Sequence, residues 1–242
     1  MQRIDATVQE TQRSGRVPGW LLVASGIAMI VLLAMHPDGN ATSFAAVLKD
    51  EAANRRMDAF VHGGLIVVVA IQMACYAICS LRFTPPKNAS IAGLVFFCFG
   101  ATLLAGSALI DGLVLPAIAA RYADIPAQLD AARTLYVFGA TMISFLMPMG
   151  IGFQAVGILS WSWRGLRIRG RSLGVIGLLI GLIALVAAAT VLSGMNPMTL
   201  MVGIAALALW AVLFGSAMLG APTGAPPSLP TDTALHPRSA DT

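Results

Sequence analysis

Residues 173–192 read LGVIGLLIGLIALVAAATVL, a run with no side chain more polar than that of Thr190. An α-helix needs about 20 apolar residues to cross the roughly 30 Å hydrocarbon core of a bilayer. Unpaired backbone groups in lipid cost several kcal/mol each, so a segment of this kind crosses as a helix. This stretch therefore predicts a transmembrane helix and places the chain among integral membrane proteins.

Five further apolar segments have the length of a membrane-spanning helix. The sequence holds 57% hydrophobic and 11% charged residues, whereas soluble domains carry about 25% charged residues. We therefore predict an all-α integral membrane protein with a six-helix transmembrane domain over residues 17–220. The five segments cover residues 19–35, 59–81, 91–119, 134–163 and 198–219.

The two ends of the chain differ from this domain in composition. Residues 1–16 are polar, and residues 221–242 are rich in Pro, Thr, Ser and Ala. Both carry too little apolar surface to offset chain entropy, so we predict two disordered tails. The first apolar segment has an alternative interpretation as a cleaved signal peptide. Its apolar run is long for that purpose and no small-x-small cleavage site follows it, so we favour a retained helix.

The basic residues indicate the orientation in the membrane. With the N-terminus in the cytoplasm, ten Lys and Arg residues fall on the cytoplasmic side and five on the outer side. Cytoplasmic loops carry the excess of Lys and Arg in multi-pass proteins. The prediction is N-in and C-in, with Trp161 and Trp163 as interfacial anchors beside the most basic loop. The composition resembles that of bacterial proteins, which favours the bacterial inner membrane.

The net charge of +4 does not indicate a nucleic-acid partner, because the basic residues lie in short loops between apolar segments. Membrane orientation explains them instead. The expected partner is the lipid bilayer, and a partner membrane subunit or a homo-oligomer is left open.

The first outer loop, residues 40–58, is predicted to contain a short amphipathic helix. Thr42 or Ser43 is suited to cap it, and Phe44 and Leu48 form an apolar edge beside charged residues. A helical extension of the second transmembrane helix is the alternative. Either arrangement adds a small cap on the outer side.

Four ionisable side chains are predicted near the outer boundary of the membrane. His36 ends the first segment in HPDGN, residues 36–40, which is typical of a helix stop followed by a turn. His62 opens the second segment, and Asp58 lies four residues before it on the same helix face. Asp111 lies about 20 residues, or roughly 30 Å, beyond the cytoplasmic start of the third segment. We therefore expect His36, His62 and Asp111 to converge from three helices.

Further polar side chains follow these helices inward. Helical steps of three and four along the second segment reach Gln72 and Tyr76, while Ser107 and Ser144 lie on the third and fourth segments. Polar groups within a bilayer normally face protein or water rather than lipid. We predict that these four residues form a polar seam inside the bundle. The last two segments lack such groups, so we expect them to be scaffold and any pocket to lie among the first four helices.

The leading functional hypothesis is a protein that binds or translocates a small molecule, an ion or protons through an outer-facing pocket. Imidazoles titrate near neutral pH, and a carboxylate at membrane depth is costly enough to suggest a function. One alternative is a non-catalytic membrane subunit or assembly factor. Another is a b-type haem protein with His36 and His62 as axial ligands. The ligand and any cofactor, haem b included, are left open.

Motifs of catalysis and metal binding are missing from the sequence. It contains no phosphate-binding glycine loop, no HExxH and no nucleophile elbow, so we favour a non-enzymatic role, assign no catalytic residue and leave catalysis open. Cys75, Cys79 and Cys98 lie within apolar segments, where packing is the favoured role. We predict no metal site, with only His36 and His62 as candidate ligands.

Overall fold

The protein is built from helices. A computed structural model describes residues 2–36, 42–82, 88–168, 171–194 and 198–220, and these contain no β-strand. Six helical stretches in this part of the chain are long and apolar enough to cross a membrane, as predicted. The elements are α1 (Gln2–Ala34), α2 (Phe44–Arg82), α3 (Asn88–Leu109), the π-helical turn η1 (Ile110–Val114), α4 (Leu115–Tyr122), the 3₁₀ turn η2 (Pro126–Gln128), α5 (Leu129–Ile168), α6 (Arg171–Leu192) and α7 (Met198–Gly220).

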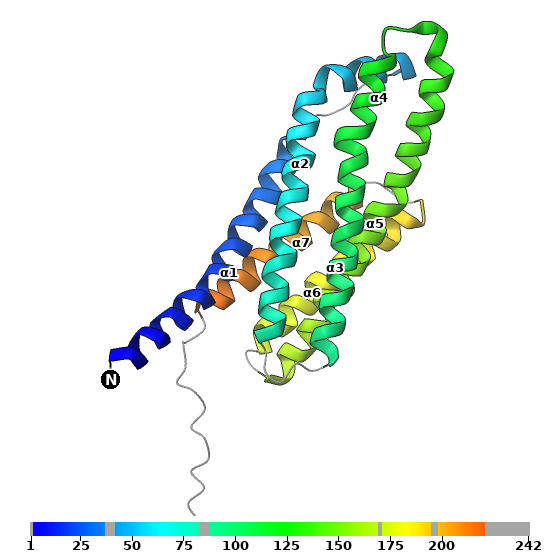
Figure 1. The fold of residues 1–242 in the computed structure, drawn as a ribbon. Coiled ribbons are helices and arrows are strands. Elements are labelled where there is room, and N and C mark those ends of the chain that lie inside the picture. Colours follow the sequence, from blue (N-terminus) through cyan, green and yellow to red (C-terminus); the bar gives the residue numbers. More distant parts are fainter. Residues whose placement is uncertain (1, 37–41, 83–87, 169–170, 195–197, 221–242) are drawn as a thin grey trace, which may run out of the picture.

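The long helices form a ring in which chain neighbours pack side by side. The contacts run from α1 through α2, α3, α5 and α6 to α7, and α7 packs back against α1 (Figure 1). Glycines allow close approach at two of these seams. A Cβ added to Gly100 of α3 would lie 2.5 Å from the Gly150 carbonyl oxygen of α5. One added to Gly26 of α1 would lie 2.8 Å from the Ala208 carbonyl oxygen of α7.

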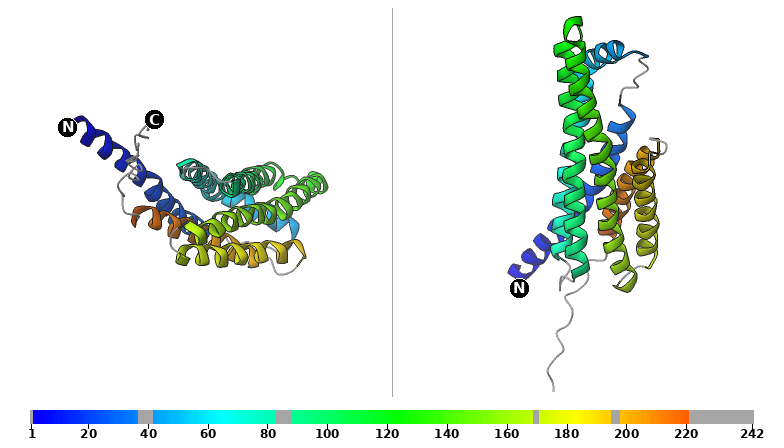
Figure 2. Two further views of the ribbon diagram at one scale, coloured as in Figure 1. Left: turned by 90° about the horizontal axis from the view of Figure 1, so that it is seen from below. Right: turned by 90° about the vertical axis from the view of Figure 1, so that its right-hand side faces the viewer.

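The helices differ in length, and the difference builds a cap at one end of the bundle. Helices α2 and α5 have 39 and 40 residues, whereas α6 and α7 have 22 and 23. At 1.5 Å per residue, the longer helices are roughly 25 Å longer than the shorter ones. The cap consists of residues 44–58 of α2, all of α4 and η2, and residues 129–136 of α5 (Figure 2).

The cap has a small apolar cluster of its own. Leu48, Ala119 and Ala132 are buried there, separately from the main core. At its edge the Tyr136 hydroxyl donates a hydrogen bond to Glu51 over 3.0 Å. These contacts hold the cap as a packed unit above the ring.

Two boundaries differ from the sequence prediction. The expected short amphipathic helix is part of α2, which is one continuous helix from Phe44 whose first turns bend across the cap (Figures 1 and 2). No helix-breaking residue separates the two parts, so the alternative of a helical extension is the correct one. Helix α1 begins at Gln2 and includes most of the segment expected to be a disordered tail. The predicted tail at residues 221–242 lies outside the described residues.

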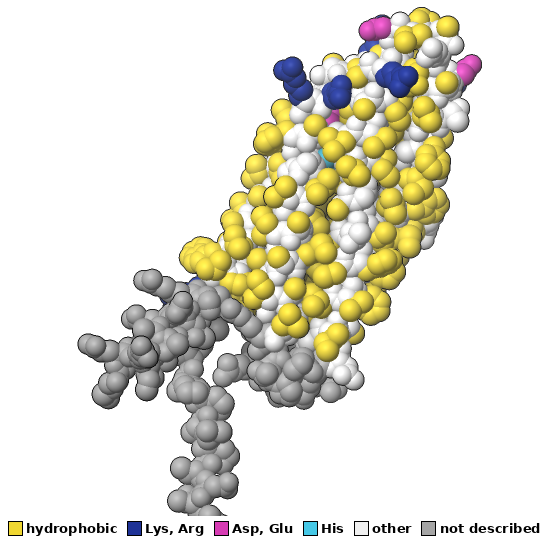
Figure 3. Space-filling model, viewed as in Figure 1, with side chains coloured by type: hydrophobic (Ala, Val, Ile, Leu, Met, Phe, Trp, Pro, Cys, Tyr) yellow, Lys and Arg dark blue, Asp and Glu magenta, His cyan; other side chains and the backbone are white. Residues whose placement is uncertain are grey.

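The surface of the ring is apolar. Large exposed side chains such as Val67, Phe138 and Leu179 cover the long helices, while the visible charged side chains gather at the cap end (Figure 3). In water such a surface would be unstable, whereas lipid tolerates it. The architecture is therefore compatible with a helical bundle in a membrane.

Candidate functional site

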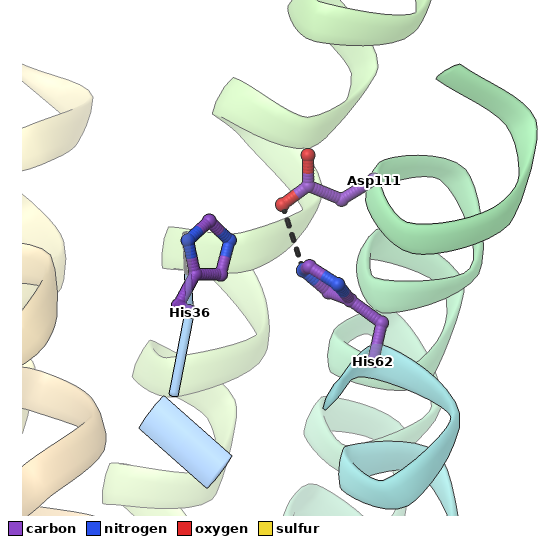
Figure 4. A group of neighbouring side chains, drawn as sticks. All are labelled: His36, His62 and Asp111. Carbon is purple, nitrogen blue, oxygen red and sulfur yellow. Dashed lines mark hydrogen bonds and ion pairs between the residues drawn. The ribbon is translucent and has the colours of Figure 1, made fainter. Parts of the chain in front are cut away.

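Three side chains from three helices meet inside the ring at the base of the cap. His36 follows the end of α1, His62 lies on α2 and Asp111 lies in η1 (Figure 4). Each offers one atom suited to metal binding, and the three atoms lie within 4.8 Å of one another. The sequence predicted that these groups share one level, and the structure brings them into direct proximity.

His62 is the central member of this group. Its side chain is 4% exposed, and its Nε2 atom lies 3.1 Å from Oδ2 of Asp111. Its other ring nitrogen, Nδ1, lies 3.0 Å from the backbone carbonyl oxygen of Asp58. Because a carbonyl oxygen only accepts, Nδ1 carries the hydrogen and donates it. In neutral His62 the Nε2 atom then presents a lone pair toward Asp111.

His36 completes the group from the opposite side. The His36 and His62 rings are in edge-to-face contact, with their centroids 5.1 Å apart and an interplanar angle of 77°. His36 is exposed, whereas the Asp111 side chain is 30% exposed and His62 is almost fully covered. The group therefore has a buried side at His62 and an accessible side at His36.

Asp111 is positioned by a local irregularity of its helix. Pro116 has no N–H group, so it cannot donate to the carbonyl of Gly112 four residues earlier. Nearby, the Leu115 N–H donates to the Ile110 carbonyl, a bond that spans five residues instead of four. The resulting π turn adds a residue to the helical turn that carries Asp111, and such turns are frequent at functional sites.

Gly112 allows this turn to approach α2. A Cβ at this position would overlap Cβ of His62 and lie 2.5 Å from its Cγ atom. Only a glycine therefore fits between η1 and the His62 side chain. The sequence DGLVLP, residues 111–116, thus supplies the carboxylate, the glycine of the close contact and the proline beside the π turn.

A pocket adjoins the three side chains. Its volume is about 350 Å³, and His36, His62 and Asp111 all line it. The remaining lining side chains are apolar, except that of Ser144. They come from α1, α2, α3, α5 and α7 and from the end of α6. The expectation that the pocket lies among the first four helices is thus incomplete, because α6 and α7 supply part of its wall.

Asp58 plays a different part from the one expected. Its residue is 5% exposed, and its backbone carbonyl holds the His62 ring. Its carboxylate is not part of the three-residue group. It therefore acts on His62 through the main chain.

The predicted polar seam is divided between two environments. Three of its members, Gln72, Tyr76 and Ser107, are buried. The amide nitrogen of Gln72 and the hydroxyl groups of Tyr76 and Ser107 have no hydrogen-bond partner among the described residues. Tyr76 instead stacks on Trp161, with ring centroids 5.0 Å apart. Ser144 lines the pocket and donates its hydroxyl hydrogen to the Thr141 carbonyl over 2.7 Å. Only Ser144 is therefore shared with the pocket.

Several structural features were not found from the sequence. Leu33 and Met29 line the pocket about one and two turns before His36, respectively, and helical steps backward from His36 would have identified them. Leu200 and Ile204 of α7 also line it, but no polar residue on that helix marks its pocket-facing side. Gln154, which is 1% exposed with both amide atoms unpartnered in the described structure, was overlooked within an apolar segment.

Comparison with known proteins adds no assignment. No protein-family model, curated protein or solved structure matches this chain. The chemistry of the site is therefore argued from its own geometry.

The haem hypothesis does not fit that geometry. Two axial histidines coordinate iron from opposite faces of the macrocycle. Here the two rings touch edge to face, and Asp111 lies within 4.8 Å of both ligand nitrogens. No space for a macrocycle remains between the rings, so we do not retain this hypothesis. The alternative of a non-catalytic subunit stays a prediction.

Proposed function

We propose that this protein is a multi-pass membrane protein that binds a divalent transition-metal ion through His36, His62 and Asp111. The observation that carries the proposal is the convergence of two imidazoles and one carboxylate within 4.8 Å. Imidazole and carboxylate are ligands for Zn²⁺ and related ions, and three protein ligands with an open position are typical of reactive or exchangeable sites.

The distances are close to those that such an ion requires. Ligand atoms lie about 2.0–2.2 Å from Zn²⁺, so two neighbouring ligand atoms in a tetrahedral site are roughly 3.4 Å apart. The His62 and Asp111 atoms are 3.1 Å apart. The widest separation in the group does not exceed 4.8 Å. Under this proposal the three ligand atoms move closer together when an ion binds.

The hydrogen bond from His62 to Asp58 supports a cation at this position. Because Nδ1 donates to the Asp58 carbonyl, the Nε2 lone pair of neutral His62 faces the Asp111 carboxylate. Two electron-rich atoms at this distance need a proton, on Nε2 or on the carboxyl group, or a metal ion between them. Metal-binding histidines commonly donate their second ring N–H to a carbonyl or carboxylate in this way.

The site is proposed to face the outside of a bacterial inner membrane. Helix α6 ends and α7 begins toward the cap, whereas α5 ends and α6 begins at the other end of the bundle (Figure 1), and the sequence between Arg164 and Arg171 is the most basic connection. Because cytoplasmic loops carry the excess of Lys and Arg, the cap is assigned to the outer face. His36 then gives an external ion access to the site.

Cobalt binding tests the proposed function. Co²⁺ replaces Zn²⁺ in sites of this kind and reports its ligands by visible absorption. We expect the detergent-purified, metal-stripped protein to bind one equivalent of Co²⁺. Asp111→Asn and His62→Gln should each weaken binding at least about 100-fold, since even residues that only support a ligand contribute 10–100-fold.

Glu51→Gln is the matched control, because Glu51 is a carboxylate of the cap that bonds Tyr136 and lies outside the ligand group. Its Co²⁺ affinity should equal that of the wild-type protein. Affinity should also fall on acidification, because protons compete with the metal for imidazole and carboxylate. A wild-type protein that binds no Co²⁺ or Zn²⁺ would overturn the proposal and leave an imidazolium–carboxylate pair in its place.

A further inference from the structure

The pocket below the three ligand side chains has the shape and chemistry of a binding site for an organic molecule. We propose that it holds a lipophilic small molecule with a single oxygen-containing head group, which coordinates the metal ion. This inference rests on the proposed metal binding and adds the ligand class of the same site.

The pocket extends inward from the proposed metal position along three helices. Met29, Val69 and Leu104 line the pocket. Along the chain they lie seven residues from His36, His62 and Asp111, respectively. Seven residues of helix span about 10 Å. An extended hydrocarbon chain of about eight carbons covers the same distance. The pocket is thus deep enough for a short alkyl chain that starts at the metal.

The walls favour an apolar molecule. Met147 of α5 and Ile204 of α7 add apolar side chains to those of α1, α2 and α3. Outside the ligand group the one polar wall residue is Ser144, and its hydroxyl hydrogen is already donated to the Thr141 carbonyl. A polar molecule would lose its water without regaining hydrogen bonds, which costs free energy. An alkyl chain gains free energy in the same space.

The metal would anchor the polar end of this molecule. Three protein ligands leave at least one coordination position of a tetrahedral ion open. All three residues that would hold the ion line the pocket, so a molecule in the pocket would be next to the ion. Small-molecule sites of about 300–1,000 Å³ typically combine apolar walls with a few convergent polar groups, and this pocket of about 350 Å³ has that composition.

Two hydroxamic acids test the inference on the Co²⁺-loaded protein. Acetohydroxamic acid coordinates the ion with the same head group as octanohydroxamic acid but lacks the chain that would enter the pocket. Each buried methylene strengthens binding about fourfold. After competition by the detergent micelles, we expect the octyl compound to bind at least about 30-fold more tightly, as measured by the change in Co²⁺ absorption.

Pocket-filling variants separate binding in the pocket from partition into the micelle. Ala105→Phe on α3 and Ile204→Phe on α7 each place a ring in the pocket, and they act from different helices in case one of them fails to fold. We expect both to reduce the affinity ratio of the two compounds to below about fivefold, since the chain then remains outside. Val67→Phe is the matched control, because Val67 is 59% exposed on α2 and does not line the pocket. It should keep the wild-type ratio.

The outcomes distinguish the two proposals. A protein that binds no Co²⁺ overturns the metal site itself. A protein that binds Co²⁺ but shows equal affinities for the two hydroxamic acids keeps the metal site and overturns the lipophilic ligand. The lipophilic ligand is likewise overturned if the filling variants retain the full wild-type ratio, because the chain then gains its affinity elsewhere.

Discussion

Single atoms decide whether the ligand group forms. The missing Cβ of Gly112 lets η1 lie against His62, and the carbonyl of Asp58 sets which ring nitrogen faces Asp111. Neither residue contributes a metal-binding atom to the group. Residues that position ligands in this way can matter as much as the ligands themselves.

Gly112→Ala should therefore damage both the fold and the site. The added methyl group would overlap the His62 side chain, so η1 and α2 must separate. We expect a loss of about 1–3 kcal/mol of stability, typical of overpacking, seen as a lower Tm in detergent. Co²⁺ affinity should fall at least about tenfold because Asp111 moves away from His62.

The control for this substitution is Gly106→Ala on the preceding helix. No atom lies within 4 Å of a Cβ placed there, so the methyl group meets open space. Alanine is favoured over glycine in a helix by about 0.5–1 kcal/mol. Equal Tm values for the two variants would contradict the packing role of Gly112.

At the scale of elements, the π turn determines where Asp111 points. One extra residue in a helical turn rotates the side chains before and after it by about 100° relative to each other, so the turn sets the direction of Asp111 relative to α4. The turn occurs where Pro116 withholds a donor from the Gly112 carbonyl. Proline thus acts on the site from a position five residues beyond the ligand.

Pro116→Ala restores that donor and should allow a regular α-helix through residues 110–114. Asp111 would then rotate away from His62, and we expect Co²⁺ affinity to fall at least about tenfold while the helical circular dichroism is kept. Pro18→Ala is the control, since Pro18 is also a buried proline inside a helix but lies in the middle of α1, away from the three-residue group and outside the pocket. An unchanged affinity in Pro116→Ala would show that the proline does not set the ligand geometry.

At the scale of the whole molecule, unequal helix lengths place the site at the junction of the ring and its cap. The pocket is lined by the ends of α6 and α7 near Val191 and Leu200, so it lies where the short helices stop. A bilayer matched to the short helices would have its boundary at this level. The site would then contact water on the side of His36, and the ring of helices around it would contact lipid.

The orientation is tested by labelling cysteines in intact bacteria with a membrane-impermeant maleimide. Lys49 is exposed on the cap and Ala89 is exposed at the other end of the bundle. We expect Lys49→Cys to react in intact cells and Ala89→Cys to react only after permeabilisation. The wild-type chain is the background control, since Cys75 and Cys79 are buried. The reverse pattern would place the site on the cytoplasmic side.

The existence of six long apolar helices follows from the sequence, because each apolar run is long enough to favour a helix by itself. The common level of His36, His62 and Asp111 was equally readable, since helix rise per residue converts sequence distance into depth. Neither inference depends on how the helices pack.

Rotation about the helix axes and the shape of the pocket were decided by tertiary structure. Whether Asp111 points at His62 depends on a π turn, and the bend of α2 depends on packing in the cap. Leu200 and Ile204 face the pocket because of where α7 lies in the ring, although their own sequence gives both faces the same apolar character. The depth of a side chain follows from its position along its own helix, whereas the direction in which it points depends on how that helix packs against its neighbours.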